Sequence, residues 1–225
     1  MTCLCSQSPI RFQRPRTWRL EVALPYGHVV RPFPRCLSPG DAVLYRADPT
    51  PLDRVIELTT HSIWIHAGML AWDDDQAQWE ILDTRAWHGA RRTPLFQAVQ
   101  ENPGHWDHFR ANAGERWPGF SRAAAVAMAD EYLNRPYGWL SLLRDGLAHL
   151  PLPCNVLPAR DLRYGAEEGD LPFCSQLLAI CWLAGGVNAF PHLPPERVEP
   201  VHVAQSLFCE YAGTFWPEPE DDEDD

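Results

Sequence analysis

The sequence lacks several features that mark large functional classes. Its 19 basic residues form no clusters beyond Arg11 to Arg19 and the pair Arg91 and Arg92, whereas a nucleic-acid groove needs such clusters. It contains no Gly-rich phosphate loop of the P-loop or dinucleotide-binding type. No apolar run reaches the roughly 18 residues that a membrane-spanning helix requires. These absences predict a protein with no nucleic-acid partner, no cofactor and no membrane span.

Regular cysteine spacing and a targeting segment are missing as well. The seven cysteines are an odd number at irregular intervals, which argues against a disulfide framework and for a reducing compartment. The N-terminal residues Met1 to Arg19 include no apolar segment of signal-peptide length and carry several arginines. We therefore expect a soluble protein of the cytoplasm.

What is present indicates one main domain. The chain has 225 residues, of which 45% are hydrophobic, so a sizeable core can be buried. We find no internal repeat and no linker that divides the chain. Residues 1–38 are rich in Pro and Arg and are expected to form an extension packed on the domain, which then spans residues 39–217. Residues 218–225 carry much of the net charge of -11 and are expected to be a disordered acidic tail.

Apolar patterning predicts strands and two prominent helices. Strands are expected over residues 42–46, 62–72 and 78–83, with further candidates at 18–24 and 105–111. Ser121 can cap a helix over 122–134 that Pro136 stops. A second helix over 174–184 is apolar on nearly every face and should be buried. The pattern predicts an α+β fold in which this second helix packs on a mostly antiparallel sheet of about five strands.

Cys174 is a candidate nucleophile because it stands where a helix begins. Leu171, Pro172 and Phe173 read as extended chain, so the helix starts at or just after Cys174. A helix N-terminus and a neighbouring histidine both lower the pKa of a thiol. The free N–H groups of the first turn can also hold an oxyanion during acyl transfer. The alternative is a buried structural cysteine, which is common at such positions.

His66 is the candidate base, and Glu80 is the candidate third member. His66 lies in the strand 62–72, and alternation places it on one face with Trp64 and Gly68. Glu80, in the following strand, is expected to accept the other ring N–H and fix the tautomer. Asp83 and His88 lie near enough to compete for that role. The alternative readings are a core histidine and a carboxylate on a solvated strand face.

The order of these segments resembles a known family. Four segments follow one another in the chain, namely Gly40-Asp41-Ala42-Val43-Leu44, the strand 62–68 with His66 inside it, the strand with Glu80, and Phe173-Cys174-Ser175-Gln176. This order is similar to that of the circularly permuted NlpC-type papain-like hydrolases, the branch that includes YiiX-like proteins. Histidine precedes cysteine in that branch, and triads are defined by geometry rather than by chain order.

The resemblance, which covers roughly residues 40–186, implies a permuted papain-like fold and a cysteine hydrolase. The segment Asn134-Arg135-Pro136-Tyr137-Gly138-Trp139 looks like the Pro-Tyr segment that precedes the cysteine helix, so Tyr137 would line the active site. Ser175 and Trp64 are expected to contact the substrate with it. The NlpC-type motif Asp-Cys-Ser-Gly is Phe-Cys-Ser-Gln here, which places the chain nearer the YiiX-like proteins than the cell-wall peptidases.

The predicted reaction is cleavage of an amide, peptide or isopeptide bond through a thioester on Cys174. Two alternatives stay open at this point. One is a non-catalytic binding module on the same fold, and the other is an acyltransferase or thioesterase that acts on lipid. A metal site is not expected. Cys3 and Cys5, or His105 and His108, offer ligand pairs, but no second pair has the spacing of a zinc site.

Overall fold

A computed structural model describes residues 19–23, 29–30, 37–47, 62–85, 88–138 and 172–216, the first two ranges as backbone only. The expected acidic tail, most of the expected N-terminal extension, and Cys3 and Cys5 lie outside these residues.

The described residues form one antiparallel sheet of eight strands. Its strands follow one another in the order β2-β1-β8-β7-β3-β4-β5-β6, and every neighbouring pair is antiparallel. The strands are β1 (Arg19–Ala23), β2 (Val29–Val30), β3 (Ala42–Arg46), β4 (Trp64–Asp73), β5 (Gln78–Arg85), β6 (Gly89–Pro94), β7 (Trp106–Ala111) and β8 (Cys209–Trp216). β1 joins the rest of the sheet through β8.

Alternation along the central strands gives the sheet two buried faces. Leu44 and Met69 belong to a large core on one face, whereas Val43 and Leu70 belong to a smaller core on the other. Successive side chains of a strand point to opposite faces. The central strands are apolar on both sides because helices cover both faces of the sheet.

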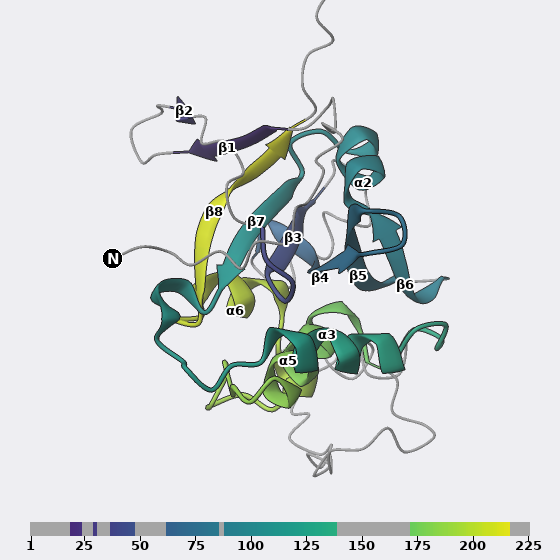
Figure 1. Cartoon of the computed structure of the whole chain (residues 1–225). Helices are drawn as coiled ribbons and strands as arrows, with labels where there is room; N and C mark the ends of the chain where they lie inside the picture. The colour runs from purple at the N-terminus through teal and green to yellow at the C-terminus, as the bar shows by residue number, and fades with distance from the viewer. Residues whose placement is uncertain are drawn as a thin grey trace, which may run out of the picture.

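The helices are divided unequally between the two faces. They are α2 (Leu95–Glu101), α3 (Arg122–Glu131), α5 (Cys174–Ala184) and α6 (Pro200–Gln205), with 3-10 turns η1 (Ala113–Glu115) and η2 (Pro195–Arg197). Residues of α3, α5 and α6 pack in the large core and those of α2 in the small core, so α2 lies across the sheet from α5 (Figure 1).

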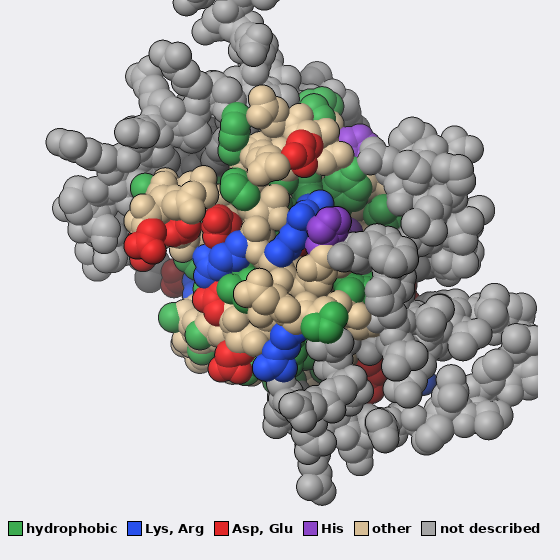
Figure 2. Space-filling view, turned by 90° about the vertical axis from the view of Figure 1, so that its right-hand side faces the viewer, with side chains coloured by type: hydrophobic (Ala, Val, Ile, Leu, Met, Phe, Trp, Pro, Cys, Tyr) green, Lys and Arg blue, Asp and Glu red, His purple; other side chains and the backbone are tan. Residues whose placement is uncertain are grey.

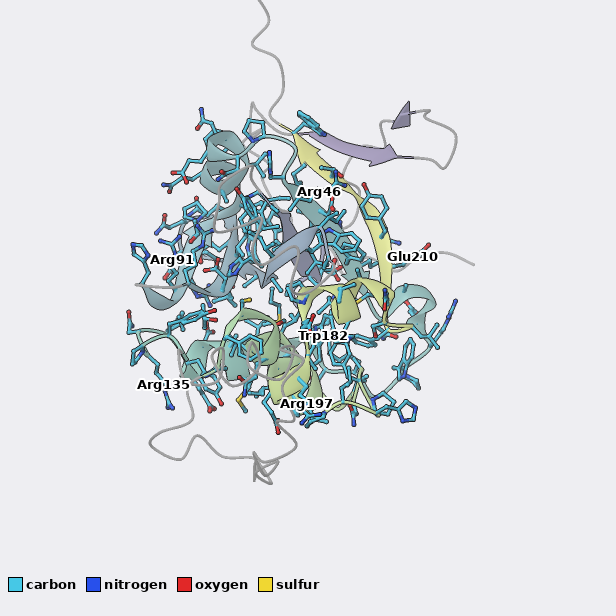
Figure 3. All side chains as sticks on the ribbon, turned by 180° about the vertical axis from the view of Figure 1, so that it is seen from behind. Arg46, Arg91, Arg135, Trp182, Arg197 and Glu210 are labelled. Atoms are coloured by element: carbon cyan, nitrogen blue, oxygen red, sulfur yellow. The ribbon has the colours of Figure 1, made fainter. Side chains whose placement is uncertain are left out.

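α5 is the central helix of the large core and packs directly on β4 and β5. Trp182 lies where the helices meet the sheet (Figure 3), and its indole N–H donates to the carbonyl of Gly40 at 2.9 Å. α3 packs on α5 and begins at Ser121, whose hydroxyl accepts the N–H of Ala124 at 3.2 Å. These contacts hold α5 against the sheet.

The predicted α+β class and the cysteine-bearing helix on an antiparallel sheet are confirmed. The predicted number of strands was too low. β6 was missed because its middle residues, Arg91, Arg92 and Thr93, show no apolar alternation. β6 is an edge strand, and an edge strand can carry charged residues without such alternation. The capped helix is shorter than predicted, since α3 ends at Glu131. No helix within the described ranges has the length and apolar character needed to cross a bilayer.

Candidate active site

Cys174 is the first residue of α5. Phe173 before it is extended, with φ -89° and ψ 176°, and its N–H donates to the side-chain carbonyl of Gln176 at 3.4 Å. This reversal of the chain at Phe173 starts the helix at Cys174, as the sequence predicted. The Cys174 side chain is nearly buried, and the residue is 7% exposed.

The cysteine meets the sheet at the place where the pairing of β4 with β5 begins. The first pair along β4 is Gly68 with Asp83. Just before it, the N–H of Ala67 donates to the sulfur of Cys174, and so does the N–H of Ser175 from the helix itself. The sulfur therefore sits between the end of a strand ladder and the start of a helix, with backbone N–H donors from both.

His66 lies next to this point, beside a β-bulge. Tyr45 pairs with His66 across β3 and β4, but the next residue, Arg46, pairs with Trp64, so Ile65 is an extra residue in β4. A bulge of this kind redirects neighbouring side chains and is frequent beside functional sites. The Cys174 thiol and the His66 ring are hydrogen-bonded to each other.

Cys174 and His66 favour the charged form of one another. Burial raises the pKa of the Cys174 thiol, but the His66 charge, a hydrogen bond from His66 and the two backbone N–H groups outweigh burial and lower it. Burial also lowers the pKa of His66, yet the charge of Cys174 and the contact with Asp83 raise it to about 9. These opposite shifts favour the thiolate–imidazolium form of the pair over the neutral thiol and imidazole.

Asp83, not Glu80, contacts the histidine. His66 Nε2 lies 2.9 Å from Asp83 Oδ2, which leaves Nδ1 for Cys174. The predicted third member, Glu80, binds Arg92 instead, with 3.0 Å between Oε2 and Nη1. Glu80 and Asp83 are three residues apart on β5, so their side chains point to opposite faces. His88, the other candidate, is exposed in the turn before β6.

The Gly68 position makes room for the contact between Asp83 and His66. A Cβ at Gly68 would lie 2.5 Å from Ile81 Cγ2 and 3.3 Å from Asp83 Cβ. Any side chain there would push against β5 at the level of the Asp83 carboxylate. The missing side chain thus lets the histidine and the carboxylate meet on one face.

Tyr137, which the resemblance places in the active site, lies close enough to Cys174 to respond to its charge. Burial raises the pKa of the Tyr137 hydroxyl, and the charge of Cys174 raises it further. Two backbone hydrogen bonds hold this segment on β6, from Ala90 N–H to the Arg135 carbonyl and from Asn134 N–H to the Ala90 carbonyl, both 2.9 Å. Gly89 is required beside them. Its φ is +72°, and a Cβ there would lie 2.1 Å from the Arg135 oxygen.

The Ser175 side chain points away from the site. Its hydroxyl is fully buried and donates to the carbonyl of Val198 at 2.5 Å. The prediction that this side chain contacts substrate is therefore wrong in this structure, because its donor is used inside the protein. Only the backbone N–H of Ser175 faces Cys174.

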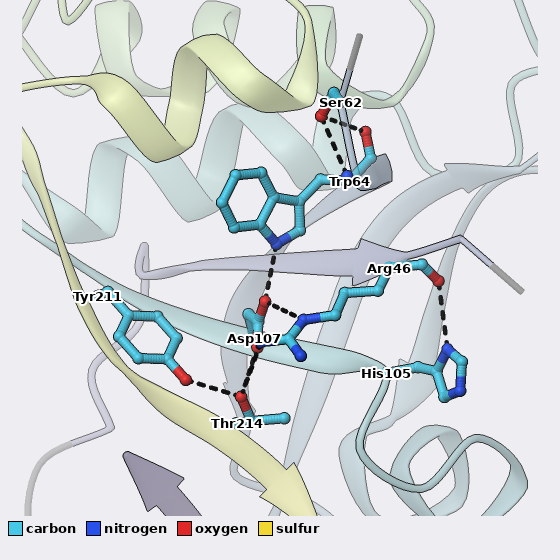
Figure 4. A network of polar contacts seen from close by, with 7 residues as sticks. All are labelled: Arg46, Ser62, Trp64, His105, Asp107, Tyr211 and Thr214. Atoms are coloured by element: carbon cyan, nitrogen blue, oxygen red, sulfur yellow. Dashed lines mark hydrogen bonds and ion pairs between the residues drawn. The ribbon is translucent and has the colours of Figure 1, made fainter. Parts of the chain in front are cut away.

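Trp64 is likewise engaged within the protein. Its indole N–H donates to Asp107 Oδ2 at 2.7 Å, and the same oxygen accepts from Arg46 Nε at 2.7 Å (Figure 4). Trp64 packs edge-on against Phe109 of the large core, whereas His66 lies near Trp106 of the small core. The prediction that Trp64 and His66 share a face failed because the bulge at Ile65 breaks the alternation. Sequence reasoning had no signal for this bulge.

No metal site is apparent among the residues that the structure describes. Nowhere in those ranges do three or more His, Cys, Asp or Glu side chains form a group that could hold an ion. His105 and His108, the candidate pair, have different partners. His105 Nδ1 lies 3.3 Å from the carbonyl of Arg46, and His108 Nε2 lies 3.0 Å from Asp41 Oδ2.

The fold and the site together define an α+β protein of YiiX-like fold. The structure is similar to the crystal structure of metalloprotein YiiX from Escherichia coli O157:H7 (DUF1105), with a TM-score of 0.51 and 16% sequence identity over 79% of this chain and 97% of that chain. No protein-family model and no curated protein sequence matches the chain. The likeness to YiiX concerns the fold. Among the residues that the structure describes, no donor set fits a metal.

Proposed function

We propose that the protein is a papain-like cysteine hydrolase of the permuted type, with Cys174 as nucleophile, His66 as base and Asp83 in place of Glu80 as the orienting carboxylate. The supporting observation is the buried thiol at a helix start in contact with a histidine whose second nitrogen lies 2.9 Å from a carboxylate. Nucleophile, base and orienting group in this sequence of contacts are the signature of covalent acyl transfer.

The mechanism follows from these contacts. The Cys174 thiolate attacks an amide, peptide or isopeptide carbonyl, and the imidazolium of His66 protonates the leaving amine. His66 then takes a proton from water, which hydrolyses the thioester and expels the Cys174 thiolate, so that the thiolate–imidazolium pair is regenerated. Asp83 holds Nε2 of His66, so Nδ1 faces the sulfur throughout. The N–H groups of the first turn of α5 are available to stabilise the tetrahedral oxyanion.

The lipid alternative receives less support from the described residues. Apolar side chains from both the sheet and α5 pack behind Cys174 and leave no water-sized space there; they are Met69, Leu82, Ala129, Leu177, Leu178 and Cys181, with Gly68. An acyl chain could not enter from that side without repacking the core. A cavity of about 380 Å³ lies between α5 and residues 188–198, and its lining does not include Cys174 or His66.

Selective alkylation tests the proposal against a non-catalytic module. Iodoacetamide at pH 7 should label Cys174 at least about tenfold faster than Cys181 or Cys209, because only the Cys174 pKa is lowered, while burial raises the other two. Labelling sites and rates are read by peptide mass spectrometry. Equal rates at all three cysteines would refute the cysteine hydrolase.

A further inference from the structure

Two arginines converge on the carboxylate that holds the histidine. Arg85 Nε lies 2.7 Å from Asp83 Oδ2, the same oxygen that contacts His66, and Arg91 Nε lies 3.7 Å from Oδ1. Asp83 itself is fully buried. It therefore faces a cation from each of three adjacent strands, His66 on β4, Arg85 on β5 and Arg91 on β6.

These two arginines differ from the other paired arginines in the sheet and its helices. Arg46, Arg92 and Arg122 each bind protein acceptors through more than one nitrogen. Arg85, by contrast, uses only Nε. The Nε of Arg91 is buried with no hydrogen-bond partner, and so is Asp83 Oδ1. Within the described part of the chain, the Nη groups of Arg85 and Arg91 have no protein acceptor.

Both side chains also reach the surface. The Arg85 side chain is 27% exposed and that of Arg91 is 33% exposed. Arg85 lies over the ring of Trp106, 5.6 Å from its centroid, which fixes its direction. Arg91 lies on the same side of the molecule as Arg135 (Figure 3). Figure 2, which looks onto the side with β5 and β6, shows basic side chains at the surface beside a histidine.

The charge balance of the site leaves one positive charge uncompensated. Arg85 and Arg91 are positive and Asp83 is negative, while Cys174 and His66 carry no net charge together, whether their shared proton lies on the sulfur or on the ring. His66 and Arg85 already lower the pKa of Asp83, whereas Arg91 makes no hydrogen bond to it. An arginine with free Nη groups is suited to bidentate binding of a carboxylate or a phosphate.

We propose that Arg85 and Arg91 form an anion-binding subsite, so that the preferred substrate carries a carboxylate or phosphate group near the bond that Cys174 attacks. This inference rests on the proposed function, because it concerns the specificity of that centre. The anion would occupy the Nη groups that have no acceptor among the described residues. Such a group would raise the local substrate concentration and orient the carbonyl toward the sulfur.

The test uses thiol probes of matched shape, because the substrate is unidentified. N-iodoacetyl-glycine carries a carboxylate, N-iodoacetyl-glycinamide is neutral, and N-iodoacetyl-aminomethylphosphonate carries a phosphonate. Labelling of Cys174 in the full chain is followed by mass spectrometry at low ionic strength. We expect an anionic probe to react about tenfold faster than the neutral one. A larger gain for the phosphonate would indicate a phosphate-bearing substrate, and a larger gain for glycine a carboxylate.

Variants distinguish the anion preference that the arginines cause from the preference that the His66 imidazolium causes. The imidazolium is present in every variant and attracts anions in all of them. Arg91→Gln should reduce the anion preference at least about threefold, and Arg91→Lys, which keeps the charge, should retain most of it. Arg92→Gln is the matched control, because Arg92 is the next residue on β6 and is 27% exposed, but binds Glu80 and Asp130. It should leave the preference unchanged.

Each outcome decides between the two proposals. If Cys174 labels selectively but the parent, Arg91→Gln and Arg92→Gln show the same preference, the anion subsite is wrong and the hydrolase stands. If neither class of probe labels Cys174 faster than Cys209, the hydrolase is wrong and the subsite fails with it.

Discussion

His66 Nε2 and Asp83 Oδ2 are 2.9 Å apart, and this contact determines which way the imidazole presents its other nitrogen. Because Asp83 takes Nε2, Nδ1 is left for the Cys174 sulfur. β5 thereby orients the ring through Asp83, β4 carries His66, the proposed base, and α5 carries Cys174, the proposed nucleophile. The three residues of the site come from three separate elements, and none of these elements fixes the position of the other two.

The first prediction concerns pH. The pKa of Cys174 is lowered and that of His66 is raised to about 9. A lowered thiol pKa means that the thiolate persists as pH falls through the usual range, until the pH reaches that lowered value. Iodoacetamide labelling of Cys174 should therefore remain fast at pH 6.5, where an ordinary thiol is protonated.

On the alkaline side, labelling and turnover should separate. Above about pH 9 His66 loses its proton, so hydrolysis should decline because the leaving amine is no longer protonated. Labelling should continue, since the thiolate is still present. Labelling and hydrolysis rates measured from pH 5 to pH 10 test both the acid and the alkaline side of the profile. A labelling profile with a midpoint near 8.5, the value of a free thiol, would contradict the ion pair.

The second prediction separates the two carboxylates of β5. Asp83→Asn should reduce turnover by on the order of 10²-fold or more, because an amide no longer stabilises the imidazolium and can impose the wrong tautomer. Glu80→Gln is the control. It should keep nearly full activity, since Glu80 binds Arg92, which retains Asp130 at 2.6 Å. Steady-state kinetics decide, and equal losses in both variants would return Glu80 to consideration.

The third prediction compares two cysteines of α5, Cys174 at its first residue and Cys181 in the apolar core. Cys174→Ser should abolish labelling and turnover yet change the free energy of unfolding by less than about 1 kcal/mol. Its hydroxyl finds the N–H groups of Ala67 and Ser175 and the ring of His66. Cys181→Ser places a hydroxyl in the apolar core and should cost about 1–3 kcal/mol, with labelling of Cys174 retained.

Chemical denaturation of both serine variants gives the comparison. A much larger loss of stability for Cys174→Ser than for Cys181→Ser would mean that Cys174 is a packing residue.

The fourth prediction concerns the bulge beside His66. Arg46 and Trp64, the pair that closes the bulge, donate to the same oxygen of Asp107 (Figure 4). Asp107→Asn removes the charge that holds Arg46 and should loosen the bulge. We expect the acid limb of Cys174 labelling to move to higher pH, because a misplaced His66 lowers the thiol pKa less.

Asp41→Asn is the matched control for Asp107→Asn. Asp41 is also fully buried and paired with an arginine, Arg122, at 2.7 Å, but it contacts none of the site residues named above. Both variants should lose stability by about 1–3 kcal/mol, and only Asp107→Asn should shift the labelling profile. An equal shift of the labelling profile in both variants would mean that the shift is a general effect of destabilisation and not of the bulge.

Local signals in the sequence were sufficient for the elements that carry Cys174 and His66. Extended residues before Cys174 and an apolar run after it define a helix start, and the start of a helix lowers a thiol pKa wherever it lies. The run around His66 likewise defines a strand by composition. Tyr137 was found through a resemblance rather than through physical reasoning. β6, rich in arginine, offered no periodic signal at all.

Only the tertiary structure decided which side chains meet. Glu80 and Asp83 lie on the same strand with similar chemistry, and the choice between them depends on the pairing of Gly68 with Asp83 and on the bulge at Ile65. A shift of one residue in either would turn the other face toward the histidine. The sequence by itself was enough to propose Cys174 and His66, because the signals for the helix and the strand that carry them are local. The third partner was decided by strand register, which depends on contacts between residues distant in the chain.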